Sequence, residues 1–176
     1  NTRTSLTTQV PRLERLLLDA DVNVGLEPLL RAVGFRTEFA FRVANVRSDR
    51  DILRWARRHR YIYVCHDKFG DKQTRLEIYP EIFHYGGRVI QITGGPQQNL
   101  YTSLGKLLIH REKWVEWFQS NQGIVTLSMD KIRTQDAHQL YTMVQRTMDL
   151  AVNPEETMRR RRIRRQQMER PQRQVP

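Results

Sequence analysis

The feature that most constrains the fold is a regular alternation of short apolar runs with longer segments of helical periodicity. Runs rich in aliphatic, β-branched or aromatic residues predict strands at residues 15–19, 37–41, 61–65, 88–93 and 123–128. The segments between and after them predict helices at 23–33, 49–59, 74–83, 99–118, and from 134 to beyond 154. Strand–helix repeats of this kind form parallel sheets that carry helices on both faces. The sequence therefore predicts a three-layer α/β sandwich with a mainly parallel five-stranded sheet.

Length and charge divide the chain into one folded body and two flanking segments. The 176 residues suffice for one domain with a full core, but not for two comfortable ones. Residues 1–14 are mostly polar, and we expect an irregular lead-in. Residues 157–176 hold eight arginines and one acid, so this tail contributes +7 to the formal net charge of +11. Residues 15–156 form the predicted α/β domain, which is only mildly basic.

The Arg-rich tail is too charged to bury an apolar core of its own, so we expect it to be disordered. It is a candidate arm for binding RNA, DNA or an acidic protein, with a merely solubilising extension as the alternative. The single cysteine, Cys65, excludes an internal disulfide framework and a Cys-only metal site. No apolar run reaches the length of a membrane span, and no segment has the pattern of a signal peptide. We expect a cytoplasmic protein that does not bind membranes.

Four aspartates occupy the predicted junctions between strands and helices. Asp19 and Asp21 follow the first strand, Asp49 opens the second helix after Ser48, and Asp67 follows the third strand. Because the carboxyl ends of parallel strands share one edge of a sheet, ligands bind there and these side chains can converge. Gathered carboxylates repel one another unless a cation lies between them, and a hard divalent cation prefers oxygen ligands. A metal held in this way is typical of phosphodiester hydrolysis.

Each of these acids also has a local interpretation. Asp19 can cap a helix, Asp49 lies in a first helical turn where acids are favoured, and Asp67 suits a turn.

Cofactor-binding loops are not indicated, because Gly94-Gly95-Pro96 lacks the Lys-Ser/Thr of a P-loop and no GxGxxG occurs.

Three short motifs resemble those of PIN-like nuclease domains, specifically the short PIN-like group found near toxin–antitoxin loci. The motifs are Leu17-Leu18-Asp19-Ala20-Asp21, Ser48-Asp49-Arg50-Asp51-Ile52-Leu53 and Val64-Cys65-His66-Asp67-Lys68-Phe69. The resemblance covers about residues 15–70. It implies a PIN-like fold and a metal-dependent ribonuclease, in which Asp19, Asp49 and Asp67 are catalytic acids that bind Mg²⁺ or Mn²⁺. Asp21 would be an additional metal-binding acid, and an antitoxin protein would be a partner.

Two positions depart from the pattern of this family. Cys65 replaces a threonine whose hydroxyl could orient Asp67, and Phe69 stands where a second acid is often found, with Asp71 as a displaced substitute. These departures keep an alternative open, in which a catalytically weak or inactive PIN-like module binds nucleic acid or protein.

Several other residues are candidates for contact with substrate or partner. Arg47 and Lys68 flank the acids and can contact a phosphate backbone. In the tail the candidates are Arg159, Arg160, Arg161 and Arg162. His66 is either a general acid or base, a phosphate contact or a structural histidine. The stripe of Trp114, Trp117 and Phe118 is expected to pack in the core, with a homodimer surface as the alternative.

Overall fold

The computed structural model of the chain describes residues 14–43, 48–66, 69, 71–95 and 97–152. Within these residues, six strands form one sheet in the order β2-β1-β3-β4-β5-β6. The strands are β1 (Arg15–Leu18), β2 (Arg36–Phe39), β3 (Ile62–His66), β4 (Arg88–Ile92), β5 (Gly123–Leu127) and β6 (Ile132–Asp136). Strands β1 to β5 run parallel, and β6 pairs antiparallel with β5. The predicted α/β fold with a mostly parallel sheet is therefore confirmed.

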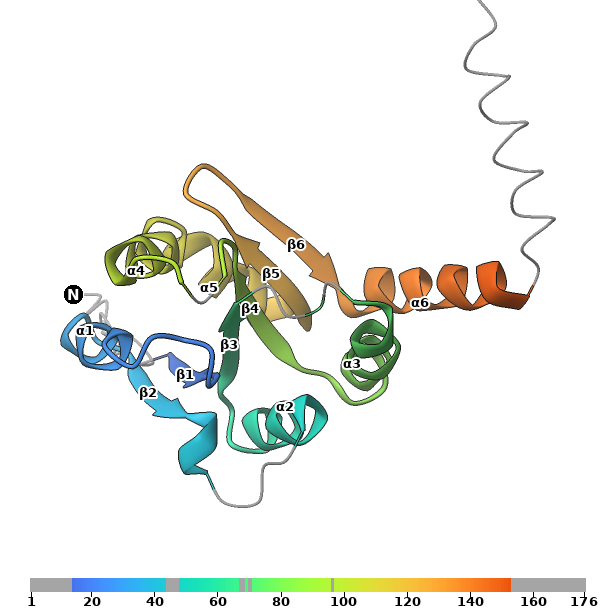
Figure 1. Ribbon diagram of the computed structural model, residues 1–176, viewed down its shortest axis with the longest axis horizontal. Helices are drawn as coiled ribbons and strands as arrows, with labels where there is room; N and C mark the ends of the chain where they lie inside the picture. Colours follow the sequence, from blue (N-terminus) through green and yellow to red (C-terminus); the bar gives the residue numbers. More distant parts are fainter. Residues whose placement is uncertain (1–13, 44–47, 67–68, 70, 96, 153–176) are drawn as a thin grey trace, which may run out of the picture.

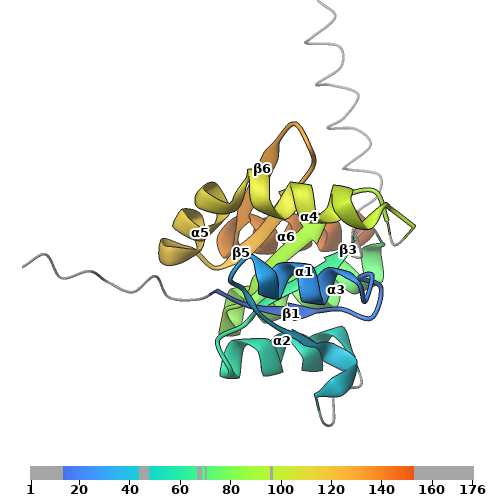
Figure 2. The same cartoon turned by 90° about the vertical axis from the view of Figure 1, so that its left-hand side faces the viewer.

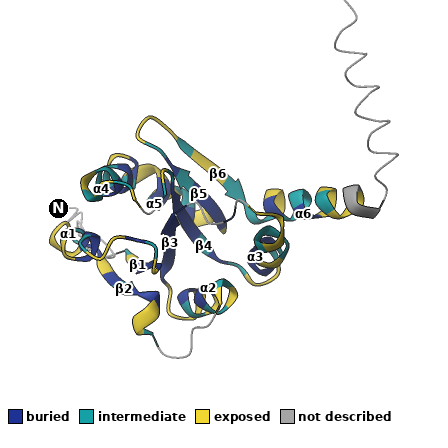
Figure 3. Cartoon of the chain, viewed as in Figure 1, coloured by how far each residue is buried: buried dark blue, intermediate teal, exposed yellow. Residues whose placement is uncertain are grey.

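Helices cover both faces of this sheet (Figures 1 and 2). They are α1 (Leu26–Ala32), α2 (Asp49–Arg58), α3 (Lys72–Tyr85), α4 (Leu100–Ile109), α5 (Arg111–Ser120) and α6 (Ala137–Val152), with a short 3-10 helix η1 (Ala40–Arg42) after β2. One core cluster joins the sheet to α1, α4 and α5, and a second joins it to α2, α3 and α6. The inner strands are buried because helices lie over both of their faces (Figure 3).

The strand β6 corrects the prediction of a five-stranded sheet. Its sequence Ile-Arg-Thr-Gln-Asp is polar, and every residue in it is at least partly exposed, so it lacks the apolar pattern of an inner strand. A tight hairpin brings it beside β5. In the turn of this hairpin, the backbone N–H of Ser128 donates to the Lys131 carbonyl at 3.0 Å. Pairing at an open sheet edge thus decides the conformation of a segment that the sequence assigns in part to the last helix.

The segment predicted as one helix over residues 99–118 is two helices joined at His110. The His110 imidazole lies 2.9 Å from the Ser128 carbonyl, which ties this junction to the end of β5. The Trp114 indole N–H donates to the Leu107 carbonyl at 2.9 Å and so satisfies an acceptor at the end of α4. Trp114 and Phe118 are buried, as predicted for core residues.

Two local patterns in the helices have clear outcomes. The Ser48 side chain accepts a hydrogen bond of 3.2 Å from the Asp51 backbone N–H and donates one of 3.0 Å to its carboxylate, so Ser48 caps α2, which begins at Asp49 as predicted. A proline inside a helix predicts a kink or a break, and the break is wrong here, because α3 continues from Lys72 to Tyr85 around Pro80.

Candidate functional site at the carboxyl edge of the sheet

The strand order places a topological switch point between β1 and β3. The chain passes from β1 to β2 on one side, and then to β3 on the other side of β1. In doubly wound sheets, ligands bind at the carboxyl ends of the two strands where the order reverses in this way. The segments after β1 and β3 therefore form the first place to look for a functional site.

Asp19 and Asp21 lie together at this switch point. The Asp19 backbone N–H donates to the Val64 carbonyl of β3 at 2.9 Å, which extends the pairing of the two strands by one residue. The Asp21 backbone N–H lies 3.5 Å from Oδ2 of Asp19, and Oδ1 of Asp21 lies 3.4 Å from the backbone N–H of His66. Asp19 is 1% exposed. A buried carboxylate such as that of Asp19 is costly in free energy unless hydrogen bonds or positive charge compensate it.

Tyr63 lies within electrostatic range of both Asp19 and Asp49. The Tyr63 side chain packs on the α2 and α3 face of the sheet, and no hydrogen bond of full geometry reaches its hydroxyl from the described residues. Burial raises the pKa of this hydroxyl, and the neighbouring Cys65, Asp19 and Asp49 raise it further through their negative charge. Asp19 follows β1 and Asp49 stands in the first turn of α2, so the electrostatic effect on this hydroxyl comes from two different elements.

His66 ends β3 on the side of Lys106. It is buried, and its Nδ1 lies 3.2 Å from the Ile92 carbonyl, to which the Nδ1–H tautomer donates. Burial lowers the pKa of His66, and the charge of Lys106 lowers it further, against the opposing effects of the Ile92 hydrogen bond and of Asp19. These contacts favour the structural interpretation of His66, with its ring neutral at neutral pH.

The sequence analysis did not identify Lys106, which lies buried at the carboxyl end of β4. Its Nζ donates to the Thr93 carbonyl at 2.7 Å and to the Gln98 side chain at 2.9 Å. Burial lowers the pKa of its ammonium group. The lysine joins α4 to the loop after β4, and a lone Lys within an apolar helix offers no sequence signal for this role.

A second feature missed from the sequence is a polar groove beside β6. Cys65, Gln91, Thr126 and Arg133 stand side by side on four neighbouring strands. The groove has a volume of about 600 Å³ and is lined by Gln91, Thr93, Thr126, Arg133, Thr134 and Gln135. The sequence signal for this groove is a polar residue inside each of two apolar strands, Gln91 in β4 and Thr126 in β5. Only the strand register shows that these residues are neighbours.

Three arginines of α2 and η1 serve the fold. Arg50 and Arg54 of α2 both donate to the buried carboxylate of Glu81 on α3, with shortest distances of 2.7 and 2.8 Å. Arg42 pairs with buried Glu27 at 2.8 Å. Among the candidate site residues, Arg47, Asp67, Lys68 and Arg159 to Arg162 lie outside the described residues. In the described part of the chain, no group of three His, Cys, Asp or Glu side chains could hold a metal ion.

The chain matches no protein-family model, no curated protein and no solved structure at a significant level. Across the described ranges, no helix is both long and apolar enough to cross a membrane.

Proposed function

We propose that this protein is a metal-dependent nuclease of the PIN-like type that cleaves RNA. The observation that carries the proposal is the pair of Asp19 and Asp21 at the switch point of a doubly wound sheet. Asp49, like Asp19, influences the pKa of Tyr63, and Asp67 directly follows the last residue of β3 in the sequence. In this proposal Asp19, Asp49 and Asp67 are the catalytic acids.

Carboxylate is the chemistry that a hard divalent cation needs, but Asp19, Asp21 and Asp49 do not by themselves form a group that could hold one, so the proposed metal site depends on Asp67. Carboxylate oxygens are the ligands that Mg²⁺ and Mn²⁺ prefer, and a few of them suffice when the substrate phosphate and water complete the coordination. When bound, such a cation polarises a phosphoryl oxygen and lowers the pKa of a water molecule. Asp19 and Asp21 would hold it on the β1 side, with Asp49 and Asp67 completing the set. Arg47, Lys68 and the tail arginines would hold the RNA backbone, and a toxin role would add an antitoxin partner.

The second candidate is a PIN-like module that binds nucleic acid or protein without cleaving RNA. Both departures from the family pattern are buried in the core beside α2 and α3, with Cys65 0% and Phe69 4% exposed. Neither position supplies an oxygen ligand or a hydroxyl at the edge of the sheet. This observation favours weak catalysis, although the four aspartates favour the enzyme.

Cleavage and metal binding by matched variants would test the proposal. Asp19→Asn keeps the size of the side chain but removes its charge, and we expect at least a hundredfold loss of Mn²⁺-dependent cleavage of mixed RNA. Calorimetric titration of Mn²⁺ should show weaker binding by the same variant. Glu116→Gln, which removes an exposed acid from α5, is the control and should keep both properties. RNA cleavage that survives chelation of the metal, or that Asp19→Asn leaves unchanged, would overturn the proposal.

A further inference from the structure

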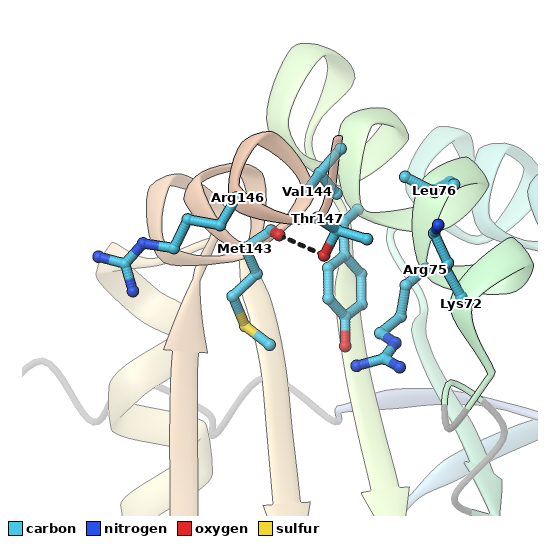
Figure 4. A pocket seen from close by; sticks show the side chains of 8 residues that line it. Lys72, Arg75, Leu76, Met143, Val144, Arg146 and Thr147 are labelled. Carbon is cyan, nitrogen blue, oxygen red and sulfur yellow. Dashed lines mark hydrogen bonds between the residues drawn. The ribbon is translucent and has the colours of Figure 1, made fainter. Parts of the chain in front are cut away.

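A groove between α3 and α6 lies apart from the acidic edge and is lined by cations (Figure 4). The helix α3 contributes Lys72, Arg75, Leu76 and Tyr79, and α6 contributes Met143, Val144, Arg146 and Thr147. The four positions on α3 have the spacing of a single helical stripe, since residues three and four apart share one face. The groove therefore belongs to the packing of two helices rather than to a loop.

The groove shares no residue with the acidic edge and lies beside the first turns of α3. The helix α3 follows β3, so its first turns lie near the carboxyl ends of the strands. At the opposite ends of the helix pair, Phe83 of α3 stacks on Tyr141 of α6 with ring centroids 4.2 Å apart. This stacking fixes the pair at the far end, and the groove is formed where the first half of α3 meets the second half of α6.

The rim of the groove is positive. Lys72, Arg75 and Arg146 line it, and none of the lining residues is acidic. In Figure 4 the guanidinium of Arg75 lies beside the groove, whereas that of Arg146 extends away from it into solvent. Elsewhere in the described structure, arginines of α1, α2 and α5 are paired with glutamates. No ion pair within the described ranges joins Lys72 or Arg146 to an acid, so their charge can meet an anionic ligand.

The walls of the groove are apolar. Leu76 and Met143 are partly buried, and Tyr79 and Val144 are buried in the core cluster behind them. The volume of about 200 Å³ is smaller than the roughly 300–1,000 Å³ of pockets that enclose a whole drug-sized ligand. The groove can therefore take only part of a ligand, such as a planar ring, while a charged group stays at the rim.

We infer that the α3–α6 groove binds one nucleotide unit of single-stranded RNA, with its ring against Met143 and Leu76 and with the two backbone phosphates that flank it at Lys72 on one side and Arg146 on the other. This inference rests on the proposed function, because it assigns a substrate contact to the same protein. A phosphate and a flat ring joined in one ligand match the positive rim and the apolar walls together. The sequence after α6 is also basic, because residues 157–176 hold eight arginines.

The test compares two double variants with the same change in charge. Lys72→Glu with Arg146→Glu changes the rim, and Arg58→Glu with Lys113→Glu changes exposed cations on α2 and α5. Binding of a fluorescently labelled eight-nucleotide single-stranded RNA is measured in a chelating buffer, so cleavage plays no part. We expect the rim variant to bind at least tenfold more weakly and the control to stay within threefold of the native protein. The slope of log affinity against log salt concentration should become shallower by about 1.4. Each neutralised phosphate contributes about 0.7 to this slope, and the rim variant no longer neutralises two of them.

Competition against the labelled RNA tests the ring. Mononucleotides should displace it from the native protein at lower concentration than inorganic phosphate does, and this difference should vanish in the rim variant. Equal loss of affinity by both double variants, no loss by either, or equal competition by phosphate and nucleotide would overturn the inference. Failure of the nuclease proposal is separable from this result. Binding that depends on the rim without metal-dependent cleavage would reject the enzyme and keep the groove.

Discussion

The carboxylate of Glu81 on α3 accepts two hydrogen bonds from the guanidinium of Arg54 on α2, at 2.8 and 3.2 Å. Arg50, one turn earlier on α2, donates to the same carboxylate at 2.7 Å. The Glu81 side chain is 1% exposed, whereas both arginines reach solvent. Because Asp49 is the first residue of α2, this contact between the two helices also sets where Asp49 stands relative to the sheet.

Glu81→Gln should therefore lower the free energy of unfolding by roughly 1–3 kcal/mol, because a neutral amide cannot replace a carboxylate that accepts from two guanidinium groups. Urea denaturation at pH 7 measures the change, with Glu116→Gln as the exposed control. An equal effect of both substitutions would show that the contact contributes no more than an exposed acid.

The same contact has a pH dependence of known sign. Burial alone would raise the pKa of Glu81, but the hydrogen bonds and charges of Arg54 and Arg50 outweigh it and lower the pKa. The contact should therefore stabilise the fold fully above the unfolded pKa of about 4.3, and lose this effect as the pH falls through the lower folded value. Denaturation curves between pH 3 and pH 6 should converge for the native protein and Glu81→Gln as the pH falls. Curves that stay parallel would contradict the prediction.

His66 predicts a second dependence on pH, at higher values. Burial lowers its pKa in the folded protein, so the unfolded chain binds a proton first as the pH falls below about 6.5. The free energy of unfolding should decrease from that pH down to the folded pKa of His66. His66→Gln removes the titrating group and should flatten this decrease, whereas the exposed His138→Gln should keep it. An unchanged slope in the His66 variant would show that its ring does not titrate differently on folding.

Two glycines should respond to alanine in opposite directions. Gly123, at the start of β5, has a φ of +146°, and an added Cβ would overlap the Gln135 carbonyl oxygen of β6. Gly105 lies within α4, where a Cβ would meet nothing nearer than the Met129 side chain at 3.8 Å. We expect Gly123→Ala to cost at least about 2 kcal/mol, and Gly105→Ala to stabilise the fold by about 0.5–1 kcal/mol. Thermal unfolding of both variants measures the difference, and a stabilising Gly123→Ala would exclude the β5–β6 pairing.

Deleting residues 158–176 should weaken binding of single-stranded RNA and leave the thermal midpoint of the domain unchanged. The deleted segment holds eight arginines, and the salt dependence of log affinity should flatten by about 0.7 for each phosphate that these arginines neutralise in the full-length protein. Titrations of the full-length and truncated proteins at several salt concentrations measure the slopes. Identical slopes would mean that the tail does not bind RNA.

The sequence by itself predicted the order of strands and helices through β5, because apolar periodicity is a local property. It also predicted that the second helix would begin at Asp49, after Ser48, and that Trp114 and Phe118 would be buried. It predicted that Asp19 would follow the first strand. Only the strand order shows that this end of the strand lies at a topological switch point. Each of these predictions depends on residues that are close together in the chain.

Only the tertiary structure decided the features that depend on distant residues. The polar strand β6 forms because β5 offers an open edge, and the predicted helix breaks at His110 where the end of β5 meets it. Lys106 is buried because the loop after β4 supplies its acceptors. The α3–α6 groove places Lys72 and Arg146 on its two sides, from positions far apart in the sequence. Strand register and helix packing are set by contacts between distant segments, and no local pattern of residues contains that information.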